Sequence, residues 1–253
     1  MHFPAYLHVG PWLVHPHPVF ESLGYAAGFQ TFLALRRRFG DPVAEQRAVL
    51  VLATIAGALV GAKLLAWGVD PPALWAARGD WHAWVEGKTI VGGLLGGHLA
   101  VELAKKALGV RTSTGDLYAA PLALGIAIGR VGCFLTGLSD RTYGTPTSLP
   151  WGVDFGDGVP RHPTQIYEMV VLGALAAVLA LRMRHGIPGD GRLFRLFMAT
   201  YLGWRFLVGF LQPAWTIAGL SVIQWACVAG LLHYVPRLRV AAPRPSPSGD
   251  PHA

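Results

Sequence analysis

The sequence predicts an all-α integral membrane protein in which seven transmembrane helices, with the N-terminus outside, form a single bundle. Hydrophobic residues make up 53% of its 253 residues and charged residues only 14%, whereas a soluble domain carries roughly a quarter charged residues. The apolar residues form seven runs, each about long enough to cross a bilayer as a helix. Most basic residues lie between these runs. Together these observations favour one compact membrane domain.

Each apolar run is expected to be helical, because a membrane offers no hydrogen-bond partner to unpaired backbone groups. In chain order the runs are 19–35, 49–67, 89–108, 117–137, 165–181, 196–211 and 219–235. We expect residues 1–236 to form one polytopic domain. Residues 237–253 are rich in Pro, Ser and Ala and are expected to be a disordered cytoplasmic tail.

The loops predict the orientation of the bundle. Fourteen Lys and Arg residues follow the first, third, fifth and seventh runs (four, three, four and three), and four lie in the opposite loops. Because basic loops stay on the cytoplasmic side, the N-terminus is expected in the periplasm and the C-terminus in the cytoplasm. The first 18 residues contain no Lys or Arg, so we expect no signal peptide. The predicted location is the bacterial inner membrane, crossed several times.

Two classes of function are excluded by composition. The net charge of +7 does not indicate a nucleic-acid partner, because no basic stripe is interleaved with aromatics on a soluble element. The two cysteines, Cys133 and Cys227, both lie inside apolar runs. They form neither a disulfide framework nor a CxxC zinc or redox motif. The sequence therefore predicts a protein whose partner is the lipid bilayer.

Arg130 is the only charged residue of the run 117–137. A charge at that depth is costly unless it faces a polar interior and finds a partner. The guanidinium binds phosphate or carboxylate through two parallel hydrogen bonds. We predict a bound anionic group, specifically a lipid phosphate. The alternative is an arginine that extends from a helix end to the interface.

Arg205 lies about one helical turn before the outer loop that follows the sixth run. Together with Arg130 it is expected to bind one phosphate from a second helix. The alternative is that each arginine forms a structural pair with Glu21 or Glu168. Charged residues inside membranes are commonly functional, which favours the shared anion.

Two residues are candidates for a general base. Glu21 is expected to open the first helix on its outer side, where a carboxylate also suits the helix dipole. His162 lies in PRHPTQIYE (160–168), beside an arginine and close to a glutamine, a tyrosine and a glutamate. A histidine titrates near neutral pH and can act as a base. A capping or interfacial role for this group is the alternative.

Glycines recur around Arg130. Gly125, Gly129 and Gly132 follow one another at four- and three-residue spacing, and residues 92–97 contain two further pairs. Small residues at such spacing let another helix or an acyl chain approach closely. We therefore expect close helix contacts on both segments.

Two outward loops are long enough to cover a site. Residues 68–88 carry three tryptophans, and residues 138–163 are dense in Gly, Pro and aromatic residues. Tryptophans at this level usually anchor a protein in the headgroup layer. Loops of this length more often shape a site than merely connect helices, so we expect these two to roof one.

The chain resembles the prolipoprotein diacylglyceryl transferase family over most of its length. The order and spacing of six segments carry the resemblance, and the combination of GRVG with PRHPTQIYE is highly specific. The segments are GGLLGG (92–97), GDLYAAPLALGIAIGRVGCFLTG (115–137), YGTPTSLPWGV (143–153), PRHPTQIYE (160–168), WRFLVGF (204–210) and LSVIQW (220–225).

The resemblance implies an inner-membrane enzyme that moves the diacylglyceryl group of phosphatidylglycerol to a lipobox cysteine thiol of a preprolipoprotein. The products would be a thioether and glycerol 1-phosphate, with no metal or cofactor. Arg130 would match the family's essential arginine, and Arg205 the arginine near the outer end of the sixth helix. We expect the substrate-binding residues to be Arg130, Arg205, Gly129, Gly132, Cys133, Tyr143, Gly144, Arg161, Gln165 and Glu168.

The chain also departs from the family pattern. Val91 stands where the family usually has a histidine, and Gly209 where it has a glutamate. Cys133 stands where the family usually has an asparagine, although the wider family also uses a cysteine there. The arginine that usually follows this glutamate is missing, and the usual tyrosine of the first helix aligns near Glu21. Residues 139–142 are a small insertion. The phosphate-binding arginines are thus retained, while the groups that orient or deprotonate the thiol differ.

Three interpretations remain open on this basis. The chain is a divergent paralogue with a different acceptor, an ordinary member that tolerates the changes, or a non-catalytic lipid-binding scaffold. In the first case Glu21 or His162 is the expected base. The donor is phosphatidylglycerol or another anionic phospholipid, since two arginines recognise phosphate rather than a whole headgroup.

Overall fold

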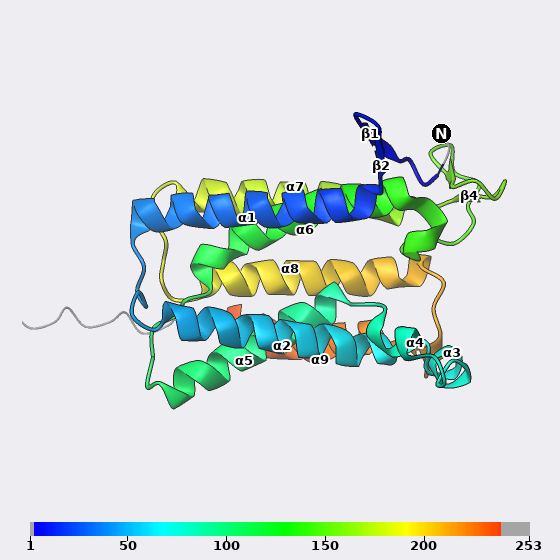
Figure 1. Cartoon of the computed structure of the whole chain (residues 1–253). Coiled ribbons are helices and arrows are strands. Elements are labelled where there is room, and N and C mark those ends of the chain that lie inside the picture. The colour runs from blue at the N-terminus through cyan, green and yellow to red at the C-terminus, as the bar shows by residue number, and fades with distance from the viewer. Residues whose placement is uncertain (1–2, 239–253) are drawn as a thin grey trace, which may run out of the picture.

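The computed structural model describes residues 3–238, so the predicted cytoplasmic tail lies largely outside the described residues. Within this range the protein is mostly helical, as predicted, and seven of its helices have 17 residues or more. They lie side by side as one elongated bundle (Figure 1). The seven are α1 (Pro16–Phe39), α2 (Arg47–Trp67), α5 (Ile90–Ala107), α6 (Asp116–Thr136), α7 (Thr164–Met183), α8 (Arg192–Val208) and α9 (Val222–Leu238).

Four helical stretches in residues 3–238 are long and apolar enough to cross a membrane. They are α2, α6 with the 3-10 turn η1 (Gly137–Asp140), α7, and α8 with the 3-10 turn η2 (Gly209–Leu211). α2 buries little of its surface within the protein and exposes large apolar side chains such as Leu52, Leu59 and Leu64. An apolar face of this size is stable only against lipid or another protein. These features indicate a membrane protein.

Glycines bring two helix pairs into close contact, as predicted for both segments. α2 packs on α5, where a Cβ on Gly61 would lie 2.3 Å from the carbonyl oxygen of Gly92 and 2.9 Å from the Cα of Gly96. α1 packs on α6, where a Cβ on Gly24 would lie 2.5 Å from the carbonyl oxygen of Gly125. Any larger residue would push the helices apart. The second contact matters here because it sets the distance between α1 and α6.

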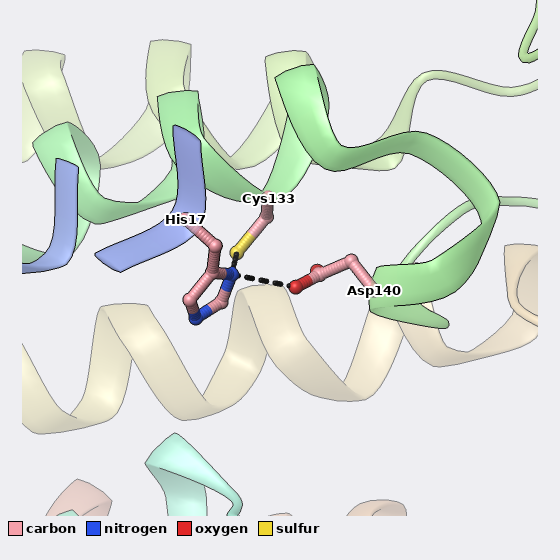
Figure 2. A group of neighbouring side chains, drawn as sticks. All are labelled: His17, Cys133 and Asp140. Carbon is pink, nitrogen blue, oxygen red and sulfur yellow. Dashed lines mark hydrogen bonds and ion pairs between the residues drawn. The ribbon is translucent and has the colours of Figure 1, made fainter. Parts of the chain in front are cut away.

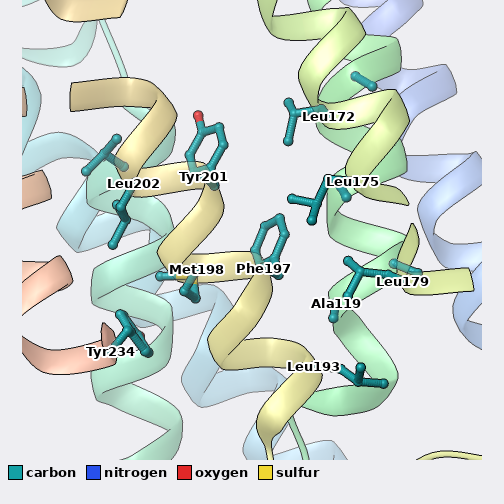
Figure 3. Close-up of a cluster of buried hydrophobic side chains, with 14 of the residues drawn as sticks. Ala119, Leu172, Leu175, Leu179, Leu193, Phe197, Met198, Tyr201, Leu202 and Tyr234 are labelled. Carbon is teal, nitrogen blue, oxygen red and sulfur yellow. The ribbon is translucent and has the colours of Figure 1, made fainter. Parts of the chain in front are cut away.

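The apolar core lies between α7, α8 and α9, with the start of α6 closing one side (Figure 3). A row of leucines on α7 faces the aromatic rings of Phe197 and Tyr201 on α8, while Met198 and Leu202 point to the α9 side (Figure 3). Residues spaced by three or four positions share a helix face, which is why these side chains form continuous rows. The buried members include Leu172, Leu175 and Leu179 of α7, Phe197, Met198, Tyr201 and Leu202 of α8, and Tyr234 of α9.

Asp116 fixes the start of α8. Its two carboxylate oxygens accept hydrogen bonds from the backbone N–H groups of Gly191, Leu193 and Phe194 at 2.9–3.1 Å. A carboxylate satisfies the free N–H groups of a helix start and complements its dipole. This contact joins the starts of α6 and α8. It therefore determines how far along the bundle the polar residues of α8 lie.

The short elements gather at one end of the bundle, and the loops after α1, α5 and α7 lie at the other (Figure 1). The sequence predicts that these latter loops are basic and cytoplasmic. The short elements include α3 (Pro71–Ala76), α4 (Trp81–Val85) and three two-stranded antiparallel hairpins. The hairpins are β1 (Leu7–Val9) with β2 (Trp12–Val14), β3 (Val153–Asp154) with β4 (Pro160–Arg161), and β5 (Thr216–Ile217) with β6 (Leu220–Ser221).

Candidate anion-binding site

Three ionised side chains from three helices meet inside the bundle. Arg130 on α6 lies with its Nε 2.9 Å from Glu168 Oε2, and its Nη2 donates to Oε1 at 3.1 Å. Arg205 on α8 donates from Nη1 to Oε2 at 3.2 Å, and the Tyr201 hydroxyl donates to Oε1 at 3.1 Å. We call Arg130, Glu168, Tyr201 and Arg205 the arginine cluster. Its ionised members are 2–7% exposed.

This geometry excludes one alternative for Arg130 and supports another. Arg130 does not extend to the interface, because it is buried between helices. The alternative of a structural pair with Glu168 holds for both arginines. One carboxylate shared by two guanidiniums nevertheless leaves the group with one net positive charge. A buried charge of this kind favours an anionic ligand, so the lipid phosphate remains a prediction.

Gln165 adds an unused polar group near this cluster. It lies three residues before Glu168, so both side chains share one face of α7. Gln165 is 1% exposed, and neither atom of its amide has a hydrogen-bond partner among residues 3–238. A buried amide without partners is costly. The group is therefore available to a ligand.

Gln212 connects the cluster to the outer loops. Its Oε1 accepts from Arg205 Nη2 at 3.3 Å, and its Nε2 donates to the Thr142 carbonyl at 2.8 Å and to Thr164 Oγ1 at 3.3 Å. The loop after α6 is thus tied to the loop after α8 directly beside Arg205. These contacts place part of the predicted roof next to the arginine cluster.

A second polar cluster, shown in Figure 2, contacts the first. His17 near the start of α1 points between Cys133 of α6 and Asp140 of η1. Its Nδ1 is 2.7 Å from Asp140 Oδ1 and 4.0 Å from Cys133 Sγ. Arg130 Nη1 donates to the same sulfur at 3.6 Å, which joins the two clusters. We call His17, Cys133 and Asp140 the histidine–cysteine cluster.

Glu21 borders the histidine–cysteine cluster. Its carboxylate pairs with Lys88, accepts from the Tyr25 hydroxyl at 2.8 Å and lies 3.7 Å from His17 Nε2. The expectation that Glu21 opens the first helix is wrong, because α1 begins at Pro16 and Glu21 lies in its second turn. The helix dipole therefore does not explain this carboxylate. Its role as a base stays a prediction.

His162 lies in the outer loop rather than at either cluster. Its Nδ1 is 3.3 Å from the Tyr167 hydroxyl, and its backbone pairs with Gly144 and Thr145. A Cβ on Gly144 would lie 2.5 Å from that of His162, so this packing requires a glycine. Within the described part of the chain, no hydrogen bond or ion pair joins His162 directly to Arg130 or Arg205.

Arg161 and Tyr143 also pack within this loop. The Arg161 guanidinium lies 5.1 Å from the centre of the Tyr143 ring and donates to Asp157 at 2.6 Å. That hydrogen bond holds the pKa of the Asp157 carboxyl below its usual range. Both predicted binding residues thus stabilise the loop fold, and their contact with substrate stays a prediction.

The glycines around Arg130 differ in their surroundings. A Cβ on Gly132 would lie 3.0 Å from Phe20 Cβ and 3.1 Å from the Cα of His17. A Cβ on Gly129 would have no atom within 4 Å among the described residues. Gly132 is therefore needed for the contact of α6 with α1, while the space beside Gly129 is open.

The substituted position Gly209 also has a structural explanation. A Cβ on Gly209 would lie 2.8 Å from Gln224 Cγ, so the side chain of Gln224 occupies the adjacent space. Gln224 is itself held by Ser221 and by the Phe206 carbonyl. Val91 is fully packed in the apolar core. The two departures are thus accommodated by packing.

His17 and Asp140 were not predicted as site residues. They lie far apart in the sequence, and only the packing of α1 on α6 brings them together. One signal was available, since Asp140 belongs to the insertion 139–142 and Cys133 is itself a departure from the family pattern. Tyr201 and Gln212 carried no comparable signal.

Comparison with known proteins agrees with the resemblance. The model of the prolipoprotein diacylglyceryl transferase family matches residues 4–236. The phosphatidylglycerol–prolipoprotein diacylglyceryl transferase of Bordetella parapertussis is 31% identical over 247 residues, covering 90% of this chain and 91% of that protein. The protein of the same name from Geobacter sulfurreducens is 33% identical over 224 residues, covering 78% and 83%. With matches along nearly its whole length, the chain belongs to the prolipoprotein diacylglyceryl transferase family.

Proposed function

We propose that the protein transfers the diacylglyceryl group of phosphatidylglycerol to the lipobox cysteine of a prolipoprotein. The names of its relatives support both substrates. The observation that carries the proposal is the convergence of Arg130 and Arg205 on Glu168, which leaves one net positive charge inside the bundle. A phosphodiester is an anion of suitable charge for this site.

The arginine cluster acts on the leaving group. During transfer a sulfur–carbon bond forms at the glycerol carbon of the donor, and the bond from that carbon to the phosphate oxygen breaks. Negative charge grows on the departing glycerol phosphate, and the two guanidiniums stabilise it. Preoriented donors of this kind commonly contribute a few kcal/mol to lowering a barrier.

The surrounding residues bind the rest of the substrates. The free amide of Gln165 binds a hydroxyl or ester oxygen of the donor, and the open side of Gly129 admits an acyl chain. Gly132 and Cys133 lie on the α6 face toward α1, and Glu168 positions both arginines. Tyr143, Gly144 and Arg161 belong to the roof. Glu21 and His162 are the candidate bases for the acceptor thiol.

The proposal includes the arrangement in the membrane. All seven long helices span the bacterial inner membrane, with the N-terminus in the periplasm and the C-terminus in the cytoplasm. The basic loops after α1, α5 and α7 support this orientation. Both polar clusters then lie in the periplasmic half of the bundle, and residues 1–236 act as a single domain.

A transfer assay tests the proposal. It combines the purified protein in detergent with phosphatidylglycerol and a lipobox peptide. We expect the peptide to gain one diacylglyceryl mass while glycerol phosphate is released. Arg130→Ala should reduce transfer at least about 100-fold through lost charge stabilisation. The variant should remain folded, because Arg205 still neutralises Glu168. Arg192→Ala is the matched control, since Arg192 pairs with Asp190 in an exposed position.

Three results would contradict the proposal in different ways. Wild-type transfer by Arg130→Ala excludes the anion site. Release of glycerol phosphate without a modified peptide indicates a paralogue with another acceptor. Val91 and Gly209 favour this paralogue, because they replace residues that are usual in the family. Bound phosphatidylglycerol without turnover indicates a lipid-binding scaffold.

A further inference from the structure

The histidine–cysteine cluster has the composition of a transition-metal site. It brings together one imidazole nitrogen, one thiol sulfur and one carboxylate oxygen, all within 4.8 Å of one another. Zinc accepts these three donor types, whereas calcium and magnesium bind oxygen ligands. The donors come from three elements that converge, and Figure 2 shows all three side chains pointing toward one space.

The distances suit a tetrahedral ion. Zinc holds such ligands at about 2.0–2.3 Å, which places ligand atoms roughly 3.3–3.7 Å from one another. The observed separations from His17 Nδ1 are 2.7 Å to Asp140 Oδ1 and 4.0 Å to Cys133 Sγ. These values bracket the expected range, so small side-chain rotations suffice.

Neighbouring groups orient two of the three ligands. In the absence of an ion, His17 Nδ1 donates to Asp140 Oδ1. A metal at Nδ1 replaces that proton, and Nε2 then keeps its own proton directed at the Glu21 carboxylate 3.7 Å away. Thr142 donates its hydroxyl to Asp140 Oδ2 at 2.5 Å and leaves Oδ1 directed at His17. A carboxylate behind a ligating histidine is typical of metal sites.

We propose that His17, Cys133 and Asp140 bind one Zn²⁺ ion. Three protein ligands leave the fourth tetrahedral position open, as in zinc sites that bind a reacting group. The ion has a route of entry, because the His17 side chain is 29% exposed. Cys133 binds as its thiolate and releases its proton to solvent. The thiolate and the Asp140 carboxylate then balance the charge of the ion.

The role of the ion rests on the proposed function. The acceptor cysteine takes the open position and loses its thiol proton to solvent, so it reaches the donor as a thiolate. Its sulfur forms the bond to the glycerol carbon, and the electron pair of the broken carbon–oxygen bond leaves on glycerol phosphate. Arg130 contacts Cys133, so the nucleophile and the leaving-group site are adjacent. The ion thereby performs the deprotonation for which the family usually has other residues.

The first test measures zinc directly. Protein is purified, stripped with a chelator, reloaded with Zn²⁺ and analysed for metal. We expect one zinc per chain, with affinity at least about 100-fold weaker in Cys133→Ser and Asp140→Asn, because loss of a ligand exceeds the roughly 10–100-fold effect of a supporting residue. Cys227→Ser and His185→Gln are the matched controls and should bind like wild type. Co²⁺ in place of Zn²⁺ should give a thiolate-to-metal absorption band that Cys133→Ser lacks.

The outcomes separate the two proposals. No zinc in wild type, or equal zinc in Asp140→Asn and Cys133→Ser, overturns the metal site. Full transfer by stripped protein overturns its role and leaves the proposed function intact. Stoichiometric zinc that depends on Cys133, combined with no lipid transfer, supports the metal site and contradicts the proposed function. Transfer that is lost on stripping and restored by Zn²⁺ supports both.

Discussion

The arginine cluster and the histidine–cysteine cluster are neighbours that share α6 but differ in construction. The first consists of ionised side chains on three long helices, and each charge is buried and paired. The second uses the start of α1, the last turn of α6 and the 3-10 turn after it. It opens to solvent only at His17, whose side chain is 29% exposed, against 8% for Asp140. Buried charges tolerate no missing partner, whereas a partly exposed group can change at small cost. The family motifs are retained in the first cluster, and two of the departures lie in the second.

The two clusters are nevertheless coupled. Arg130 and Cys133 are three residues apart on α6, so they share one helix face and contact each other. Beyond the clusters, polar contacts continue through His17 and Glu21 to Lys88. A substrate that binds Arg130 therefore lies next to the thiol and imidazole groups. The difference between the clusters predicts different responses to mutation.

The largest effect is expected from Glu168→Gln. This change leaves two buried guanidiniums without their carboxylate and should cost about 3–5 kcal/mol of stability. Asp140→Asn keeps a hydrogen-bond acceptor for His17, whose side chain is 29% exposed, and should cost less, roughly 1–2 kcal/mol. Thermal unfolding of both variants in the same detergent measures the difference. Equal destabilisation would show that the two clusters do not differ in this way.

A smaller effect separates Gly132 from Gly129. Gly132→Ala places a methyl group against Phe20 and the backbone of His17, and overpacking of this kind costs roughly 1–3 kcal/mol. Gly129→Ala meets open space and should be neutral or stabilise the helix by up to about 1 kcal/mol. Only Gly132→Ala should displace His17 and weaken zinc binding. Unfolding curves and metal analysis of the pair test this, and identical behaviour would contradict the α1–α6 contact.

The smallest effect distinguishes two roles of Glu21. If Glu21 orients His17, Glu21→Gln should weaken zinc binding roughly 10-fold and lower transfer by a similar factor. The pH–rate profile would then keep its shape. If Glu21 is itself the general base, the variant should lose the limb of the profile that reports this carboxylate. Comparison of the two profiles, with Glu86→Gln as an outer-loop control, decides between the roles.

The sequence alone predicted the helices and the need of two arginines for a polar partner. Long apolar runs in a membrane must be helical because backbone groups have no other partner, and the runs agree with the seven long helices within a few residues. A charge in such a run must have a polar partner, so Arg130 and Arg205 stood out. Glu168 was correctly considered as that partner. These predictions required only membrane hydropathy and the free-energy cost of burying a charge.

The tertiary structure alone decided which side chains meet. His17 and Cys133 are 116 positions apart, and their contact depends on α1 approaching α6 through Gly24 and Gly125. No local pattern encodes such a distance, because hydrophobic periodicity specifies which face of a helix is buried but not against which helix. The structure likewise decided where the helix that carries Glu21 begins. It also showed that backbone pairing with Gly144 and Thr145 holds His162 in the outer loop. The polar neighbourhood of Cys133 therefore follows from helix packing rather than from its sequence motif.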